Sequence, residues 1–500
     1  MPEFGYLHDD GLFFVTAKSV AEGGYKIESL PETPAQTKFP PLYPLYLSLI
    51  WRIDPRFPAN LALATGFCFA AFAACMVLAW VEYRQEFSEP RAWLLTALLA
   101  VNPYLVLFGC RMFSEVFFTC WVLAVFLALR RPGIKMALLA GIFAACAYLS
   151  RTAGIALLIS VPAVLILKKE SRRAVAFAAA MLPAILGWMM WARAHAIRST
   201  DSTLTYYTDY LRYEFLNVNF ANLGVVLWKN TDQVLWGMGS LILPKIFYLG
   251  PVKILTQVIA VAMIAGIVRL VRRGSCVQYA AFALVSTGIL LVWHFPPNER
   301  FVLPVYPLLL AGLVVELAHL AGGVKAAFQR KDAGQKIVGA AFASGVAAVF
   351  GIALAMQIYG TFVYVREAAL QKEAKLRELR TAYAWIDANL PPSATFLSYD
   401  DPLMYLYTGH RGNYLPLLPR WWYSEDYSSM VGAYGDLPDY CHGRGLQYVY
   451  FSSNDLDREL GDDLREKVQQ TVGNEAGLTP IHKTPLGEIY KVENQASARR

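Results

Sequence analysis

The sequence predicts an all-helical membrane bundle of about ten spans, joined to a small α/β domain at its C-terminus. Hydrophobic residues make up 56% of the 500 residues and charged residues only 17%, and the mean hydropathy is +0.37. This composition excludes an ordinary soluble protein. Apolar runs of about 16–22 residues recur along the chain, and a helix of that length crosses a hydrocarbon layer of ~30 Å.

The apolar runs predict ten spans, with boundaries good to a few residues. The expected spans are residues 59–81, 92–109, 115–130, 136–150, 153–167, 174–192, 253–270, 277–294, 301–320 and 337–358.

The short loops between these runs differ sharply in basic charge, which predicts their sidedness. One alternate set of loops holds sixteen lysines and arginines, whereas the opposite set holds only Arg111, Arg151 and Arg300. The sixteen are Arg84, Arg91, Arg130, Arg131, Lys135, Lys168, Lys169, Arg172, Arg173, Arg269, Arg272, Arg273, Lys325, Arg330, Lys331 and Lys336. The positive-inside rule makes the first set cytoplasmic. Orientation in a membrane therefore explains the net charge of +7, and no nucleic-acid partner is needed.

This orientation divides the chain into three parts. Residues 1–58 form an outer acidic loop with interfacial helices, residues 59–358 form the transmembrane bundle with a long outer loop at 193–252, and residues 359–500 form an extracytoplasmic α/β domain. A polar segment that must cross the membrane normally follows a span. We therefore expect a further helix before the acidic loop, which this chain lacks.

The outer loops carry the candidate functional residues. Asp9 and Asp10 precede a helical stretch that ends at Gly23 and Gly24, so they could simply cap that helix. Lys38 stands before a Pro-Pro turn, where its ammonium could meet a lipid phosphate or snorkel at the interface.

Three further outer turns hold Arg111 with Glu115, Arg151, and Arg300. Glu115 could be helix-cap chemistry, and each arginine alone could be an interfacial anchor. All these charges are expected at one membrane level, while mid-span positions are nearly all apolar. An ion or proton transporter would need ionisable groups near the bilayer midplane. The pattern instead predicts a polar site at the outer surface of a hydrophobic bundle, suited to a substrate with a lipid tail and a polar head.

Taken in order, these features resemble the C-type membrane glycosyltransferases, especially the bacterial aminoarabinose transferases and protein mannosyltransferases. The likeness rests on the acidic pair, a lysine just before Pro-Pro-Leu, an acid in the second outer loop, and a late Arg-x-x-x-Pro, and it covers roughly residues 1–360. It implies a bacterial inner-membrane enzyme that moves a sugar from a polyprenyl phosphate to a lipid, glycan or protein acceptor on the outer face, with inversion. Its family fold has one more helix, ahead of the acidic loop.

The resemblance also implies roles for individual residues. Asp9 occupies the place of the general base, and Asp10 departs from the commoner Glu. Glu115 stands where relatives carry a second acid, which could hold the acceptor or, with Asp9, a divalent metal; relatives differ in their need for metal. Lys38 and Arg300 match residues that meet the donor phosphate, while Arg111 and Arg151 are candidates by sidedness only. A flippase for lipid-linked sugars and a non-catalytic membrane scaffold remain the alternative functions.

The loop bias makes the topology testable. Reporter fusions at Lys169 and after Gly360 should report the cytoplasm and the exterior respectively, because an odd number of predicted spans, five, lies between them. The same report from both sites would contradict the ten-span topology.

Overall fold

The computed structural model describes residues 4–5, 8–245, 250–329, 333–452 and 462–493. Two of the basic loop residues, Arg330 and Lys331, lie outside the described residues. The chain divides into two compact units. Unit 1 consists of Met1–Phe67, Trp188–Val226 and Ala369–Arg500, and unit 2 of Cys68–Gly187 and Leu227–Ala368. The proposed sides of the membrane, and the boundaries at 58 and 358 that follow from them, stay predictions.

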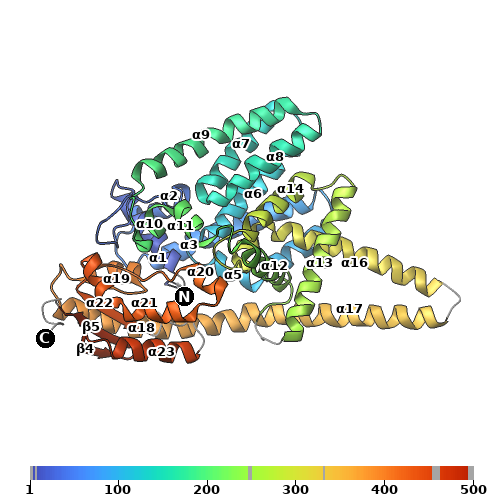
Figure 1. The fold of residues 1–500 in the computed structure, drawn as a ribbon. Coiled ribbons are helices and arrows are strands. Elements are labelled where there is room, and N and C mark those ends of the chain that lie inside the picture. Colours follow the sequence, from blue (N-terminus) through green and yellow to red (C-terminus); the bar gives the residue numbers. More distant parts are fainter. Residues whose placement is uncertain (1–3, 6–7, 246–249, 330–332, 453–461, 494–500) are drawn as a thin grey trace. The chain divides into compact units, whose positions relative to one another are not determined.

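Helices occupy each of the ten predicted apolar ranges, so the expected mostly helical architecture is confirmed. They are α3 (Leu61–Tyr83), α4 (Glu89–Ala100), α5 (Pro103–Gly109), α6 (Ser114–Leu129), α7 (Ile134–Ser150), α8 (Ile155–Leu167), α9 (Ser171–His195), α13 (Gly250–Arg272), α14 (Val277–Leu291), α16 (Tyr306–Gln329) and α17 (Ala333–Tyr359) (Figure 1). A π-helical turn, Gly360–Tyr364, joins α17 to α18 (Val365–Asn389).

Five helices of the described chain are long and apolar enough to cross a membrane, and six if the bent pair α4 and α5 counts as one span. This pair bends by 65°. The shorter apolar helices, such as α6 and α7, have 16 and 17 residues. At a rise of 1.5 Å per residue they reach only ~25 Å, less than a typical hydrocarbon layer. The protein therefore has the helices of a multi-pass membrane protein, while the number of ten spans stays a prediction.

Within unit 2, close helix contacts depend on small residues. A Cβ atom on Gly266 of α13 would lie 1.8 Å from the carbonyl oxygen of Gly312 on α16. The two backbones can therefore touch only because neither residue has a side chain, as is typical of membrane helix pairs. Near the predicted cytoplasmic ends, Arg269 pairs with Glu316 at 2.5 Å and Arg130 with Glu82 at 2.5 Å. Glu316, the one acid inside the predicted span 301–320, thus has a basic partner.

Unit 1 contains the predicted α/β domain, in which five strands form a sheet of order β2-β1-β3-β5-β4. The strands are β1 (Thr395–Leu397), β2 (Arg411–Asn413), β3 (Tyr448–Ser452), β4 (Leu478–Thr484) and β5 (Gly487–Val492). Strand β1 is parallel to β2 and β3, while β5 is antiparallel to β3 and β4. The helices are α19 (Asp401–Thr408), α20 (Pro419–Ser424), α21 (Tyr427–Gly435), α22 (Leu437–Arg444) and α23 (Asp462–Gly473). We call residues 390–493 of this unit the α/β module.

The N-terminal part of unit 1 begins with α1 (His8–Ala21) and α2 (Leu42–Ile53). Helix α1 ends as expected near Gly23, which has φ +88°, a conformation that glycine adopts without cost. It differs from the expected surface helix because it is buried on nearly every side. Phe13 stacks on Phe39 with 4.2 Å between ring centroids, and Phe14 lies 4.7 Å from Trp51. Aromatic packing, rather than a lipid surface alone, therefore covers α1.

Candidate functional site

The two adjacent acids at the start of α1 have different surroundings. The Asp9 side chain is 24% exposed, whereas Asp10 is completely buried. The Asp10 Oδ1 atom accepts a hydrogen bond from the backbone N–H of Gly11 at 2.8 Å. Successive residues on a helix point about 100° apart, so the two carboxylates leave the helix in different directions. Asp9 is the acid that a substrate can reach.

Lys38 meets Asp9 across the first loop. Its Nζ atom lies 3.7 Å from Asp9 Oδ1, with only 5% of the lysine side chain exposed. The Gln36 side chain accepts the backbone N–H of Lys38 at 2.9 Å and donates to the Thr16 hydroxyl of α1 at 3.0 Å. This link fixes the loop against α1, so that the predicted base and the predicted phosphate ligand come together.

Tyrosines from the loop at 193–252 surround the Lys38 ammonium. The ammonium lies 3.6 Å from the centroid of the Tyr206 ring and 5.5 Å from that of Tyr210. These rings come from α10 (Ser202–Thr208) and α11 (Tyr210–Asn217). Burial, together with the nearby charge of Asp9, raises the pKa of Tyr206 well above its usual value, so its ring stays neutral and attracts the cation. The sequence analysis did not identify these tyrosines as site residues, although the aromatic run YYTDYLRYEF could have indicated them.

A second cluster of predicted residues lies in unit 2. Glu115, near the start of α6, accepts hydrogen bonds on Oε1 from both Arg151 and Arg300. Arg151 also donates to the hydroxyl of Ser114 at 2.9 Å. Glu115 is therefore an ion-pair partner, and α6 has no side-chain cap at its N-cap residue, Phe113.

This cluster borders a cavity inside unit 2. The cavity encloses about 540 Å³, solvent at its opening included, and its lining contains Glu115, Arg151 and Arg300 beside Ser286 and Thr287. The Oε2 atom of Glu115 is buried and accepts no hydrogen bond from the part of the chain that the structure describes. Two guanidinium groups and one carboxylate give the cavity a net positive charge, which favours an anionic ligand.

Arg111 takes a different place. It lies in the turn between α5 and α6, is 1% exposed, and is not among the residues that line the cavity. The sequence analysis missed one basic residue of unit 2. Lys245 pairs with Glu299 at 2.7 Å and lies 3.7 Å from the ring centroid of Trp236. Its signal was the lysine that follows the apolar stretch LWGMGSLILP.

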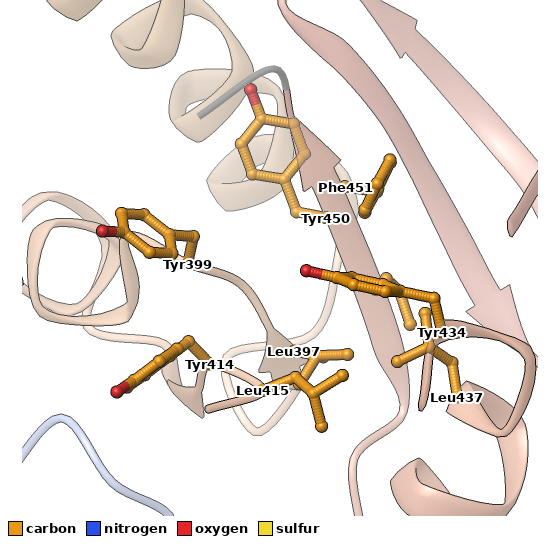
Figure 2. Close-up of a pocket in the computed structure, with 9 residues that line it drawn as sticks. Leu397, Tyr399, Tyr414, Leu415, Tyr434, Leu437, Tyr450 and Phe451 are labelled. Atoms are coloured by element: carbon orange, nitrogen blue, oxygen red, sulfur yellow. The ribbon is translucent and has the colours of Figure 1, made fainter. Parts of the chain in front are cut away.

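The α/β module has a cavity of its own, of about 400 Å³ with its opening included. Four tyrosines contribute to its lining: Tyr399, Tyr414, Tyr434 and Tyr450. Figure 2 shows the Tyr434 ring lying across it, with Tyr399 and Tyr414 on the opposite side. It lies where the parallel strands β1, β2 and β3 end, which is the usual place for a ligand in an open α/β sheet.

The described residues hold no group of three or more His, Cys, Asp or Glu side chains that could bind a metal ion. Asp9 belongs to unit 1 and Glu115 to unit 2. A metal shared by these two acids therefore stays a hypothesis.

Comparison with known proteins identifies the fold. No protein-family model matches the sequence, and no curated protein matches it. Among solved structures, ArnT from Cupriavidus metallidurans bound to undecaprenyl phosphate is similar, with a TM-score of 0.55 and 12% identity over 97% of this chain and 93% of that chain. The apo state of the same protein gives a TM-score of 0.51 and 11% identity over 98% and 94%. At this identity the likeness shows the fold, and it confirms the predicted fold of the aminoarabinose-transferase type.

The shared carboxylate of Glu115 makes a testable contribution to stability. Glu115→Ala should lower the free energy of unfolding by about 3–5 kcal/mol, because it leaves two largely buried guanidinium groups without their common partner. Thermal unfolding of the detergent-solubilised protein measures the change. Glu22→Ala breaks the exposed pair with Lys18 and should cost at most ~1 kcal/mol. Equal losses in the two variants would show that the Glu115 cluster is not a structural centre.

Proposed function

We propose that this protein is a glycosyltransferase of the bacterial inner membrane. It moves a sugar from a polyprenyl-phosphate donor to an acceptor on the extracytoplasmic face, with inversion at the sugar. The observation that carries the proposal is the pair of Asp9 and Lys38, whose charged atoms lie 3.7 Å apart. Support comes from the fold shared with ArnT, whose solved structure holds undecaprenyl phosphate.

Asp9 is the proposed general base. An acceptor hydroxyl is a poor nucleophile, and a positioned carboxylate that takes its proton typically accelerates such a step by ~10²–10⁴-fold. The partial exposure of Asp9 and the complete burial of Asp10 favour Asp9 for this role. Asp10, bonded to the backbone at Gly11, supports the first turn of the helix instead.

Lys38 is the proposed ligand of the donor phosphate in unit 1. As the bond from sugar to phosphate breaks, negative charge builds on the phosphate, and a nearby ammonium stabilises it. In an in-line displacement the acceptor and the leaving phosphate lie on opposite faces of the sugar. Inverting glycoside hydrolases accordingly hold their two catalytic carboxyl groups ~6.5–9.5 Å apart. A separation of 3.7 Å is shorter than this. We therefore infer that Lys38 turns from Asp9 to the phosphate when the donor enters.

Arg300 and Arg151 are the proposed phosphate ligands in unit 2. Both guanidinium groups border the same cavity and share one carboxylate oxygen of Glu115. A guanidinium has five N–H donors, so each arginine keeps donors for a phosphate oxygen while bound to Glu115. Arg111 remains a candidate by its predicted side only. The unused Oε2 of Glu115 suits an acceptor hydroxyl.

The test of the proposed base is the variant Asp9→Asn. It keeps the size of the side chain but removes the proton acceptor, so turnover should fall by at least ~10²-fold while donor binding survives. Membranes that contain the protein are incubated with radiolabelled polyprenyl-phosphate sugars, and the label that leaves the lipid is counted.

Two controls separate catalysis from helix capping. Asp209 caps α11 by accepting the backbone N–H of Arg212, and asparagine caps about as well as aspartate. Asp209→Asn should therefore keep full turnover, and Asp10→Asn should lose less than Asp9→Asn. Near-normal turnover in Asp9→Asn would reduce the acidic pair to a cap and would favour a flippase or a scaffold.

The phosphate ligand has its own test. Lys38→Ala should weaken binding of undecaprenyl phosphate by roughly 10- to 100-fold, since a hydrogen bond to a charged group contributes ~1.5–3 kcal/mol. Binding of the radiolabelled lipid to purified protein measures the loss. The matched control is Lys26→Ala, which removes an exposed lysine of the same segment. Unchanged affinity in the Lys38 variant would leave this lysine as a partner of Asp9 alone.

A further inference from the structure

His8, which directly precedes the proposed base, is held by the α/β module. Its Nε2–H donates to Oδ1 of Asp401 at 2.7 Å, because a carboxylate only accepts. Asp401 is the first residue of α19 and is completely buried, and His8 is 8% exposed. The Tyr414 ring packs on the imidazole with 4.6 Å between centroids, and the Tyr207 hydroxyl lies 3.1 Å from the same nitrogen. His8 therefore has one fixed position.

The backbones of α1 and α19 also approach closely. A Cβ atom on Gly11 would lie 2.8 Å from the Cβ atom of Pro402, so only glycine allows this contact. Towards the other end of α1, Lys18 pairs with Glu28 at 3.4 Å, and Glu28 accepts the Tyr405 hydroxyl at 2.9 Å. Helix α19 thus contacts the beginning of α1 directly, and it is linked to the end of α1 through Glu28.

The direction of the neighbouring side chains connects this contact to the site. His8 and Asp9 are consecutive, so their side chains leave the helix about 100° apart. With His8 bonded to Asp401, the Asp9 side chain leaves the helix in a different direction and pairs with Lys38. A free first turn of a helix would fray, and the carboxylate would then sample many directions.

We propose that Asp401 is a positioning residue for the Asp9 carboxylate, acting through His8. The α/β module is then part of the catalytic apparatus, because it fixes the helix turn from which the base projects. This inference rests on the proposed function of Asp9. Burial raises the pKa of Asp401 and the charge of His8 opposes that rise, in agreement with a buried pair whose members depend on each other.

The first experiment uses the full-length protein and the release of label from polyprenyl-phosphate sugars. Asp401→Ala should lower kcat by about 10- to 100-fold, as expected when a reacting group is misplaced by ~1 Å, with the donor KM nearly unchanged. Asp401→Asn keeps an oxygen that accepts from His8 and should recover most of the rate. If the alanine variant fails to fold, His8→Ala removes the same bond from the other side. It should lower kcat by a similar factor, and full activity in a folded His8→Ala protein would overturn the proposal.

A double variant separates positioning from general stability. In the Asp9→Asn background, Asp401→Ala should cost little further turnover, because both changes remove proton abstraction by a correctly placed Asp9 carboxylate. The control Glu32→Ala breaks another pair with the module, that with Arg444 at 2.9 Å, and should leave turnover unchanged. Losses that add in the double variant, a raised KM without a fall in kcat, or full activity in Asp401→Ala would overturn the proposal.

Hydrogen exchange gives a readout that does not depend on the reaction. Asp401→Ala should speed amide exchange in residues 8–13 of α1, and Glu32→Ala should not. Unchanged exchange in this segment would overturn the positioning role even if the enzyme is active. Faster exchange together with full turnover in Asp9→Asn would instead show that the proposed function has failed, and with it the catalytic part of the inference.

Discussion

The burial of charged groups beside apolar and aromatic side chains is the constraint on which the rest of this structure depends. An ion taken out of water costs several kcal/mol unless a partner of opposite charge and good geometry offsets the loss. Lys38 meets this condition with Asp9 and the Tyr206 ring. The partners come from three separate segments of the chain, so the pairing holds the first loop, α1 and α10 together. The chemistry proposed for Asp9 uses the same charges that fix its surroundings.

The cluster in unit 2 obeys the same rule with a different result. Glu115 accepts from both Arg151 and Arg300 on a single oxygen, which joins α6 to the turns that hold these arginines. One acid cannot neutralise two guanidinium groups, and the excess positive charge borders a cavity. A structural ion pair and an anion site are therefore not exclusive alternatives here. The ion pair stabilises the fold, and the second guanidinium group supplies the positive charge on which the proposed phosphate site rests.

Hydropathy and residue type allow the helices and the candidate site residues to be predicted from the sequence. The apolar runs indicate the helices, because a segment that crosses a hydrocarbon layer must be apolar along most of its length. The candidate residues were found one by one, as charges at the ends of apolar runs. Their pairing could not be found in this way, because Glu115 and Arg300 are 185 positions apart and His8 and Asp401 are 393 apart. Local patterns carry no record of such long-range contacts.

The same distance in sequence explains why the sequence predicts the α/β module only as a domain that follows the last helix of the bundle. Its composition is polar and its strands form a sheet of their own, so no local sequence pattern in the module indicates a contact with the acidic loop. Yet Asp401 is buried against His8, and the backbone N–H of Gly412 in β2 donates to the carbonyl of Ser29 at 2.8 Å. Asp401 of the module and His8 of α1 are each other's partners, so removing one leaves the other buried without its ion-pair partner. The module and the acidic loop therefore depend on each other for stability, and this dependence is what allows one to position the other.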